Sequence, residues 1–213
     1  MISAIRVLSW GTAWQWLLCN PADEYALLRN GTLLATTAPT VVARATVLAI
    51  PAGSGAAMDL LFDAAIPATP SDAVAFRVQV LAPPSALADE GDDAQQQTAN
   101  ASAASHVLGP PAAAAALITV EISPALPNGT RTGRVGGNPA TSFPILASET
   151  SIAVRVLVDR SVAEFFVGGG RAVQTLRAYP KAGEDRVIIA PLASSSDVVL
   201  KSIHAYDMGC GWV

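Results

Sequence analysis

Residues 152–180 constrain the fold of this chain most, because they read as three short strands joined by two tight turns. Apolar residues alternate along 152–158, the period of two that places one set of side chains on one face of a strand. Asp159-Arg160-Ser161 predicts the first turn, and Gly168-Gly169-Gly170 supplies the positive φ angles of the second. The segment therefore predicts consecutive antiparallel strands, which is typical of an all-β protein.

The rest of the chain repeats short apolar runs between Pro and Gly clusters, a spacing that predicts a two-sheet antiparallel β-sandwich. Pro21–Arg29 predicts one short N-terminal helix, with Asn20 as its N-cap. Residues 83–112 predict a disordered insert, because they carry too few large apolar side chains to offset the entropy of ordering them. The other expected strands are 2–9, 32–37, 41–50, 57–62, 74–81, 114–123, 186–192 and 198–206.

Composition narrows the classes of function. The 213 residues are 51% hydrophobic, enough for one sizeable core, and the net charge of −4 gives no reason to bind nucleic acid. No apolar run reaches the roughly 18–20 residues of a membrane-spanning helix. No metal-ligand spacing occurs, and the triple glycine is not a phosphate loop because a strand follows it, so we expect neither a metal nor a cofactor.

Three runs carry a resemblance to a known family: Val158–Phe166, then Gly170-Arg171 in a glycine turn, then Thr175–Pro180. They resemble the C-terminal β-sandwich module of glycoside hydrolase family 32, which includes the invertases, inulinases and fructan exohydrolases. Its members read V-D-x-S-x-x-E-x-F, a glycine-containing hairpin, and T-x-R-x-Y/F-P. Residues 5–29 are more weakly similar to the family's crossing from propeller to sandwich. The resemblance implies an interdomain segment at 1–30 and a sandwich module at 31–213.

The resemblance also implies that the chemistry lies elsewhere. In the family, the catalytic carboxylates belong to an N-terminal five-bladed propeller, in W-x-N-D-P-N-G-like and R-D-P motifs that this sequence lacks. A retaining glycosidase needs two carboxyl groups about 5–5.5 Å apart. We therefore expect no catalytic residue and no activity from the isolated chain. Its expected partner is the propeller, which in the parent enzyme hydrolyses β-fructofuranosyl linkages of sucrose or fructans.

Three ionised residues of the signature segment are candidate interface or structural residues: Asp159, Glu164 and Arg177. Asp159 can fix its turn by accepting local hydrogen bonds. Glu164 needs a partner if it is buried. Counting through the glycine turn places residues near Gln174 opposite Glu164, so an ion pair with Arg177 requires a diagonal reach. The alternative is that Glu164 or Arg177 points toward the propeller.

Trp10, Trp14 and Trp16 form a cluster near the N-terminus. Exposed aromatic rings stack on sugars, whereas clustered tryptophans also pack at domain interfaces. Stacking on sugars is expected of an alternative function, a free-standing lectin-like carbohydrate-binding module. Packing at a domain interface is expected of the supporting module of a two-domain enzyme. A remnant without a task is a third hypothesis.

Sequons and cysteines bear on the compartment. Asn30, Asn100 and Asn128 each begin an N-x-S/T tripeptide and are possible glycosylation sites, although such tripeptides also arise by chance. Cys19 and Cys210 either form one disulfide between the two ends of the chain or remain separate thiols. No signal peptide is evident near the N-terminus. The sequons and the family resemblance favour a secreted or vacuolar protein.

Overall fold

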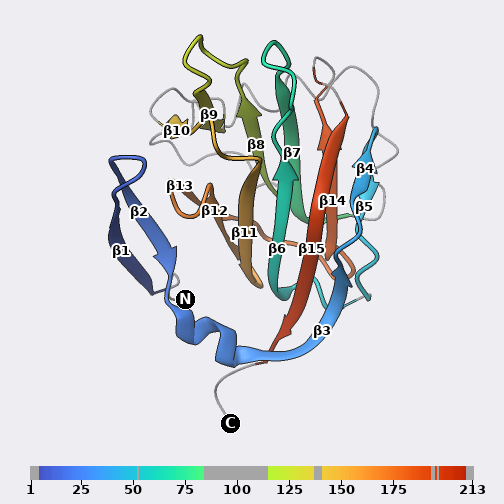
Figure 1. The fold of residues 1–213 in the computed structure, drawn as a ribbon. Coiled ribbons are helices and arrows are strands. Elements are labelled where there is room, and N and C mark those ends of the chain that lie inside the picture. The colour runs from blue at the N-terminus through green and yellow to red at the C-terminus, as the bar shows by residue number, and fades with distance from the viewer. Residues whose placement is uncertain are drawn as a thin grey trace, which may run out of the picture.

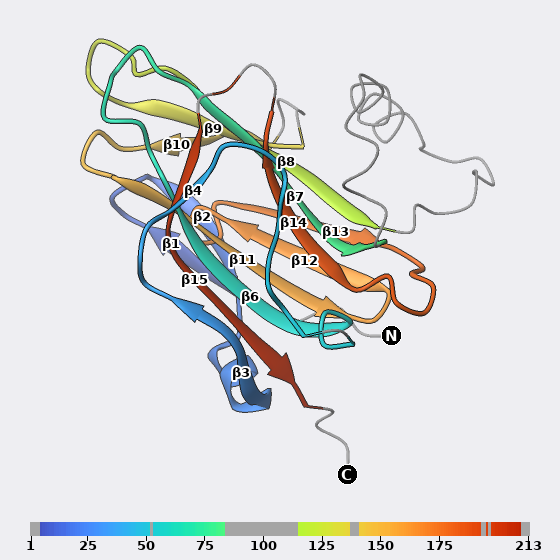
Figure 2. The ribbon, with the colours of Figure 1, turned by 90° about the vertical axis from the view of Figure 1, so that its right-hand side faces the viewer.

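The structure is a computed structural model that describes residues 5–51, 53–83, 115–136, 141–192, 195 and 197–209. Two antiparallel sheets pack face to face as a β-sandwich, and a two-stranded hairpin lies beside them (Figure 1). Seen from the side, the two sheets form two layers (Figure 2). The predicted all-β, two-sheet architecture is confirmed.

The larger sheet has the spatial order β13-β12-β11-β6-β15-β3, with β4 also paired to β15. Its strands are β3 (Arg29–Thr36), β4 (Thr40–Val42), β6 (Ala57–Ala65), β11 (Ser151–Asp159), β12 (Val162–Val167), β13 (Ala172–Arg177) and β15 (Val198–Met208). The smaller sheet has the order β10-β9-β8-β7-β14-β5. Its strands are β5 (Thr46–Val47), β7 (Val74–Ala82), β8 (Ala116–Ile122), β9 (Arg131–Val135), β10 (Phe143–Ile145) and β14 (Arg186–Pro191).

The core lies between the sheets because alternate side chains of each strand face inward. In β11 the inward set is Ile152, Val154, Val156 and Val158, as the alternation predicts. Across the core, Phe62 of β6 meets Phe76 of β7 edge to face, with ring centroids 6.2 Å apart. Such a pair contributes roughly 0.5–1.5 kcal/mol beyond the burial of its area.

The signature segment forms the three strands predicted from sequence, β11, β12 and β13, at one side of the larger sheet. The register pairs Glu164 with Thr175 and Val162 with Arg177. The residue opposite Glu164 is therefore Thr175, one position beyond Gln174. Both turns contain left-handed residues, Arg160 in the first and the three glycines in the second.

The segment expected at 41–50 is not one strand but two, because the chain crosses here from one sheet to the other. β4 pairs with β15 of the larger sheet, whereas β5 pairs with β14 of the smaller sheet. The apolar run reads as one strand because both halves are partly buried, although in different layers.

The N-terminal hairpin consists of β1 (Arg6–Gly11) and β2 (Trp16–Pro21), and the six-residue 3-10 helix η1 (Asp23–Leu28) follows it. From η1 the chain runs along the sandwich to β3 at the opposite edge of the larger sheet (Figure 1). The short helix is confirmed, but Asn20 as its N-cap is wrong. Ala22 occupies that position without a side-chain cap, while the Asn20 amide donates to the Gly169 carbonyl.

The insert expected at 83–112 lies, apart from its first residue, outside the described residues. Within the part that is described, no helix is long and apolar enough to cross a membrane.

Candidate functional site at the N-terminal hairpin

The hairpin is seated on the turn between β12 and β13. The Cys19 N–H donates to the Gly170 carbonyl at 2.9 Å, and the Asn20 side chain donates to the Gly169 carbonyl at 3.1 Å. Gly170 has φ +85°, and a Cβ there would lie 2.5 Å from Asn20 Oδ1 and 2.6 Å from the Cys19 carbonyl oxygen. The close approach of β2 therefore requires glycine at this position.

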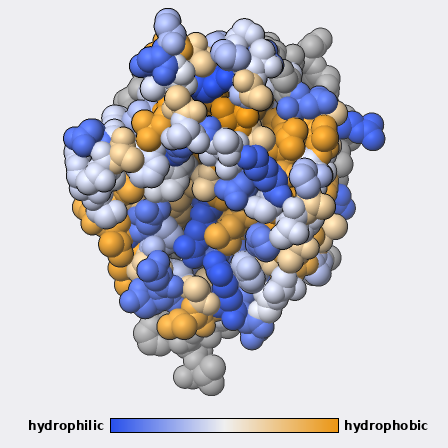
Figure 3. Space-filling view, in the orientation of Figure 1, coloured by the Kyte–Doolittle hydropathy of each residue, from blue (hydrophilic) through white to orange (hydrophobic). Residues whose placement is uncertain are grey.

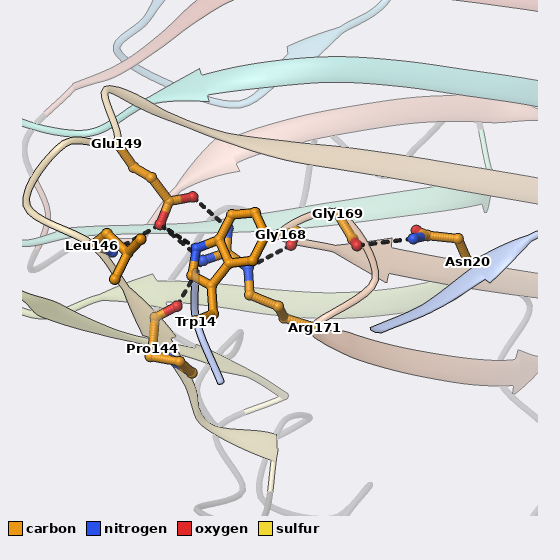
Figure 4. Close-up of polar contacts among 8 residues, drawn as sticks. All are labelled: Trp14, Asn20, Pro144, Leu146, Glu149, Gly168, Gly169 and Arg171. Atoms are coloured by element: carbon orange, nitrogen blue, oxygen red, sulfur yellow. Dashed lines mark hydrogen bonds and ion pairs between the residues drawn. The ribbon is translucent and has the colours of Figure 1, made fainter. Parts of the chain in front are cut away.

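Arg171, directly after this turn, is the central residue of the contact between the hairpin and the sandwich (Figure 4). Its side chain is 3% exposed and forms a bidentate ion pair with Glu149, with Nη2 to Oε1 at 2.7 Å and Nη1 to Oε2 at 2.9 Å. The guanidinium also donates to the carbonyls of Pro144 at 2.6 Å and Gly168 at 2.5 Å. It thus joins the β12–β13 turn to β10 and to the segment between β10 and β11.

Two tryptophans of the hairpin contact this anchor. The Trp14 ring lies 4.8 Å from the Arg171 guanidinium, within the range of a cation–π contact, and Trp14 Nε1 donates to Glu149 Oε2 at 3.0 Å. Trp16 Nε1 donates to the Arg171 carbonyl at 3.0 Å. Both indole N–H groups are therefore used to hold the hairpin on the sandwich.

The electrostatics of Glu149 follow from these donors. Burial alone would raise the pKa of the Glu149 carboxyl, but the hydrogen bonds from Arg171, the Leu146 N–H and Trp14, together with the Arg171 charge, hold the pKa below its ordinary value. Glu149 therefore stays ionised at neutral pH, with its charge balanced by Arg171.

A second ionic contact joins β1 to the outer face of the larger sheet. Arg6 Nη2 lies 2.6 Å from Glu164 Oε1 and also hydrogen-bonds Thr175, while the guanidinium lies 5.8 Å from the Phe166 ring. Glu164 is 2% exposed, so it requires a counter-charge, and Arg6 supplies one. This partner comes from the hairpin, 158 residues away along the chain.

The hairpin also exposes apolar side chains, of which Leu8, Trp10 and Leu17 share one face and Ile5 and Val7 lie on the other. Leu8 is 64% exposed and Trp10 58% exposed, and Ile5, Val7 and Leu17 are also more than half exposed. Apolar surface runs along the hairpin at the left of Figure 3, whereas the middle of the face in view is largely hydrophilic. Exposed apolar side chains that gather on one element mark a contact surface.

The other two signature residues lie apart from the hairpin seat. Asp159 is exposed at the end of β11, in the turn where the Arg160 N–H donates to the Ala56 carbonyl. Arg177 is exposed at the end of β13, and its guanidinium lies 5.5 Å from the Tyr179 ring.

The remaining candidates of the sequence analysis are scattered. Asn30 is exposed on β3, and Asn128 is exposed between β8 and β9, where its Oδ1 accepts hydrogen bonds from the Thr130 N–H and hydroxyl. Asn100 and Cys210 lie outside the described residues, so the disulfide with half-buried Cys19 stays a prediction. Among the described residues, no group of three His, Cys, Asp or Glu side chains could hold a metal ion.

Sequence reasoning selected Asp159, Glu164 and Arg177 and passed over other charged residues that the fold uses. Asp59 is fully buried on β6 between Arg29 and Arg155, each of which donates two hydrogen bonds to its carboxylate. The signal was visible, because Asp59 interrupts the otherwise apolar run 57–62. Arg171 and Glu149 carry no comparable local signal.

Comparison with known proteins places this geometry in a family. A family model described as "Glycosyl hydrolases family 32 C terminal" matches residues 32–207. A curated relative, the bifunctional 6(G)-fructosyltransferase/2,1-fructan:2,1-fructan 1-fructosyltransferase of Allium cepa, is 42% identical over 77 residues, which are 35% of this chain and 12% of the relative.

Solved structures resemble the fold at low identity. Fructan 1-exohydrolase IIa from Cichorium intybus superposes with a TM-score of 0.55 at 18% identity, over 96% of this chain and 40% of that one. Exo-inulinase from Aspergillus awamori gives a TM-score of 0.52 at 12% identity, over 97% and 35%. This chain thus spans about two fifths or less of the proteins it matches.

Proposed function

The chain belongs to the family of glycosyl hydrolase family 32 C-terminal domains, and from this membership we propose that it is the non-catalytic supporting module of a β-fructofuranosidase-like enzyme. In this proposal the module packs against an N-terminal catalytic propeller and stabilises it. The parent reaction is hydrolysis of a β-fructofuranosyl linkage in sucrose or a fructan. Residues 1–30 serve as the interdomain segment, and residues 31–213 form the sandwich module.

The observation that carries the proposal is the set of exposed apolar side chains on the hairpin. An isolated two-stranded hairpin is marginal in water, so the ionic and indole contacts to the sandwich are needed to hold it in place. Covering a half-exposed Leu or Trp contributes about 1 kcal/mol, half of the value for full burial. Leu8, Trp10 and Leu17, which share one face of the hairpin, together offer a docking partner about 3 kcal/mol.

The chemistry of the described carboxylates supports a structural role. Asp59 and Glu164 are the buried carboxylates, and each is engaged by arginine. A carboxylate whose oxygens are already engaged by arginine is poorly placed to act on a substrate. The isolated chain is therefore expected to release no fructose from sucrose or inulin.

The experiment pairs this chain with the N-terminal portion of the Allium cepa relative, expressed without its own C-terminal sandwich. We expect the two polypeptides to co-purify, and the thermal midpoint of the N-terminal portion to rise when this chain is present. A matched variant, Trp10→Ser, should weaken the complex, whereas Tyr179→Ser, at an exposed aromatic residue away from the hairpin, should not.

Two results would contradict the proposal. Release of fructose by the isolated chain would show that it carries catalytic groups of its own. Fructan binding by the isolated chain, lost in Trp10→Ser, would instead support the lectin-like alternative. Trp14 and Trp16 are less suited to that alternative, because their N–H groups already donate to protein atoms.

A further inference from the structure

The two edges of the hairpin are not equivalent. In an antiparallel pair, residues directly opposite each other alternate between those that exchange backbone hydrogen bonds and those that do not. The Ala22 N–H donates to the Ile5 carbonyl, and the register pairs Arg6 with Pro21, so Val7 and Ser9 bond to β2. The backbone groups of the residues between them point away from β2.

Arg6, Leu8 and Trp10 therefore direct their N–H and C=O groups to the outer edge of β1. The opposite edge of the hairpin is already occupied, because the Cys19 N–H donates to the Gly170 carbonyl. Within the described residues, β1 pairs only with β2. The outer edge of β1 is thus a row of up to six backbone groups available to another strand.

This edge lacks the features that usually protect an exposed strand. Natural edge strands carry lysine, proline or bulges that block pairing. β1 has a regular register over all six residues, and its single charged residue, Arg6, points its guanidinium inward to Glu164. The flanking side chains Leu8 and Trp10 are apolar and exposed.

We propose that β1 receives an additional strand from the N-terminal part of the parent enzyme, so that a sheet continues across the domain boundary. This inference rests on the proposed function and specifies how the docking is made. The N-terminal part is the expected occupant because the matched family is a C-terminal domain and this chain covers only 40% of the Cichorium intybus enzyme. Backbone pairing supplies the affinity, and Leu8 and Trp10 supply side-chain contacts.

Hydrogen exchange on the complex with the N-terminal portion of the Allium cepa relative tests the pairing. We expect the amides of Leu8 and Trp10 to become at least tenfold slower on complex formation. The amides of Val7 and Ser9, which already bond to β2, should change little. This alternation with a period of two is the signature of strand addition, and contact through side chains alone would not produce it.

A matched pair of variants separates the backbone from the side chain. Leu8→Pro removes the outward N–H while keeping an edge position that proline tolerates, and Leu8→Ala keeps the N–H with a similarly small side chain. We expect Leu8→Pro to bind about tenfold more weakly than Leu8→Ala, which corresponds to about 1.4 kcal/mol. Tryptophan fluorescence of each free variant, unchanged from the wild type, shows that the hairpin stays in place on the sandwich.

Three other results would contradict the inference. Equal affinities of Leu8→Pro and Leu8→Ala, without the alternating protection, would leave the docking intact but refute strand addition. Concentration-dependent protection of Leu8 and Trp10 in the isolated chain would assign the edge to a second copy. If the wild-type chain forms no complex, both the proposed function and this inference are refuted.

Discussion

Replacing Glu149 by Gln tests the anchor that holds the hairpin on the sandwich. The Glu149 carboxylate accepts two hydrogen bonds from Arg171 and one each from Trp14 and the Leu146 N–H. Glutamine has the same shape but only one oxygen. In its best orientation, the glutamine places its oxygen at the Oε2 position and still accepts hydrogen bonds from the three donors there. Its NH2 group then faces Arg171 Nη2, which is also a donor, so that hydrogen bond is lost.

The magnitude follows from what is lost. One hydrogen bond between charged groups contributes roughly 1.5–3 kcal/mol. Removing one partner of a buried ion pair typically costs about 3–5 kcal/mol, because the other charge stays buried. Arg171 is 3% exposed, but Glu149 is 17% exposed, so solvent screening favours the lower end. We expect Glu149→Gln to lower the free energy of unfolding by about 3 kcal/mol.

Urea unfolding followed by tryptophan fluorescence and by far-UV circular dichroism measures this loss. Fluorescence reports the hairpin through Trp14, and circular dichroism reports the sandwich. The matched control is Glu121→Gln, at an ion pair with Arg134 whose side chains are 35% and 37% exposed, where we expect less than about 1 kcal/mol. A loss at Glu149 no larger than at Glu121 would refute the reasoning.

The same variant predicts a pH dependence. Folding lowers the pKa of Glu149, so its contribution to stability is complete above the ordinary carboxyl value of 4.5 and is lost as the pH falls from there through the folded value. The stability difference between the wild type and Glu149→Gln should therefore shrink below about pH 4.5. A difference that stays constant from pH 7 to pH 3 would contradict this linkage.

Three further predictions follow from the contacts. Asp59→Asn should lower the free energy of unfolding by about 3–5 kcal/mol in urea titrations, because two arginines lose their buried counter-charge, and a loss below 1 kcal/mol would count against it. Gly170→Ala should release the hairpin, seen as a fluorescence change, whereas Gly169→Ala, with a similar φ and no atom within 4 Å, should keep it seated; equal effects would exclude the clash with Asn20 as the cause. Expression through a eukaryotic secretory route should add a glycan at Asn128 that Asn128→Gln removes, and an unchanged mass on endoglycosidase treatment of the wild type would refute the modification.

The strands of this chain could be predicted from the sequence wherever the pattern depends only on neighbouring residues. The alternation along β11 has a period of two, and the glycine triplet supplies left-handed φ angles, so both features depend only on neighbouring residues. The run at 41–50 was misread because its apolar character does not reveal which sheet each half joins. That assignment depends on β14 and β15, which lie about 150 residues later.

The candidate site was only partly predictable. The sequence identified Glu164 as a residue in need of a partner, since a buried carboxylate beside Phe165 and Phe166 must be compensated. It did not identify Arg6 as that partner, because nothing local to either residue encodes a pairing across 158 positions. Likewise, Trp14 and Glu149 are 135 residues apart, and their contact exists only because β2 lies against the β12–β13 turn.

Local periodicity and turn chemistry in the sequence thus determined an all-β sandwich and its strands, because side-chain alternation and φ preferences act between adjacent residues. The signature runs also determined the family. Tertiary structure alone decided which charges are buried, which tryptophans are anchored and which hairpin edge stays open. These outcomes depend on distant segments meeting in space, where desolvation makes the choice of partner for each buried charge energetically decisive.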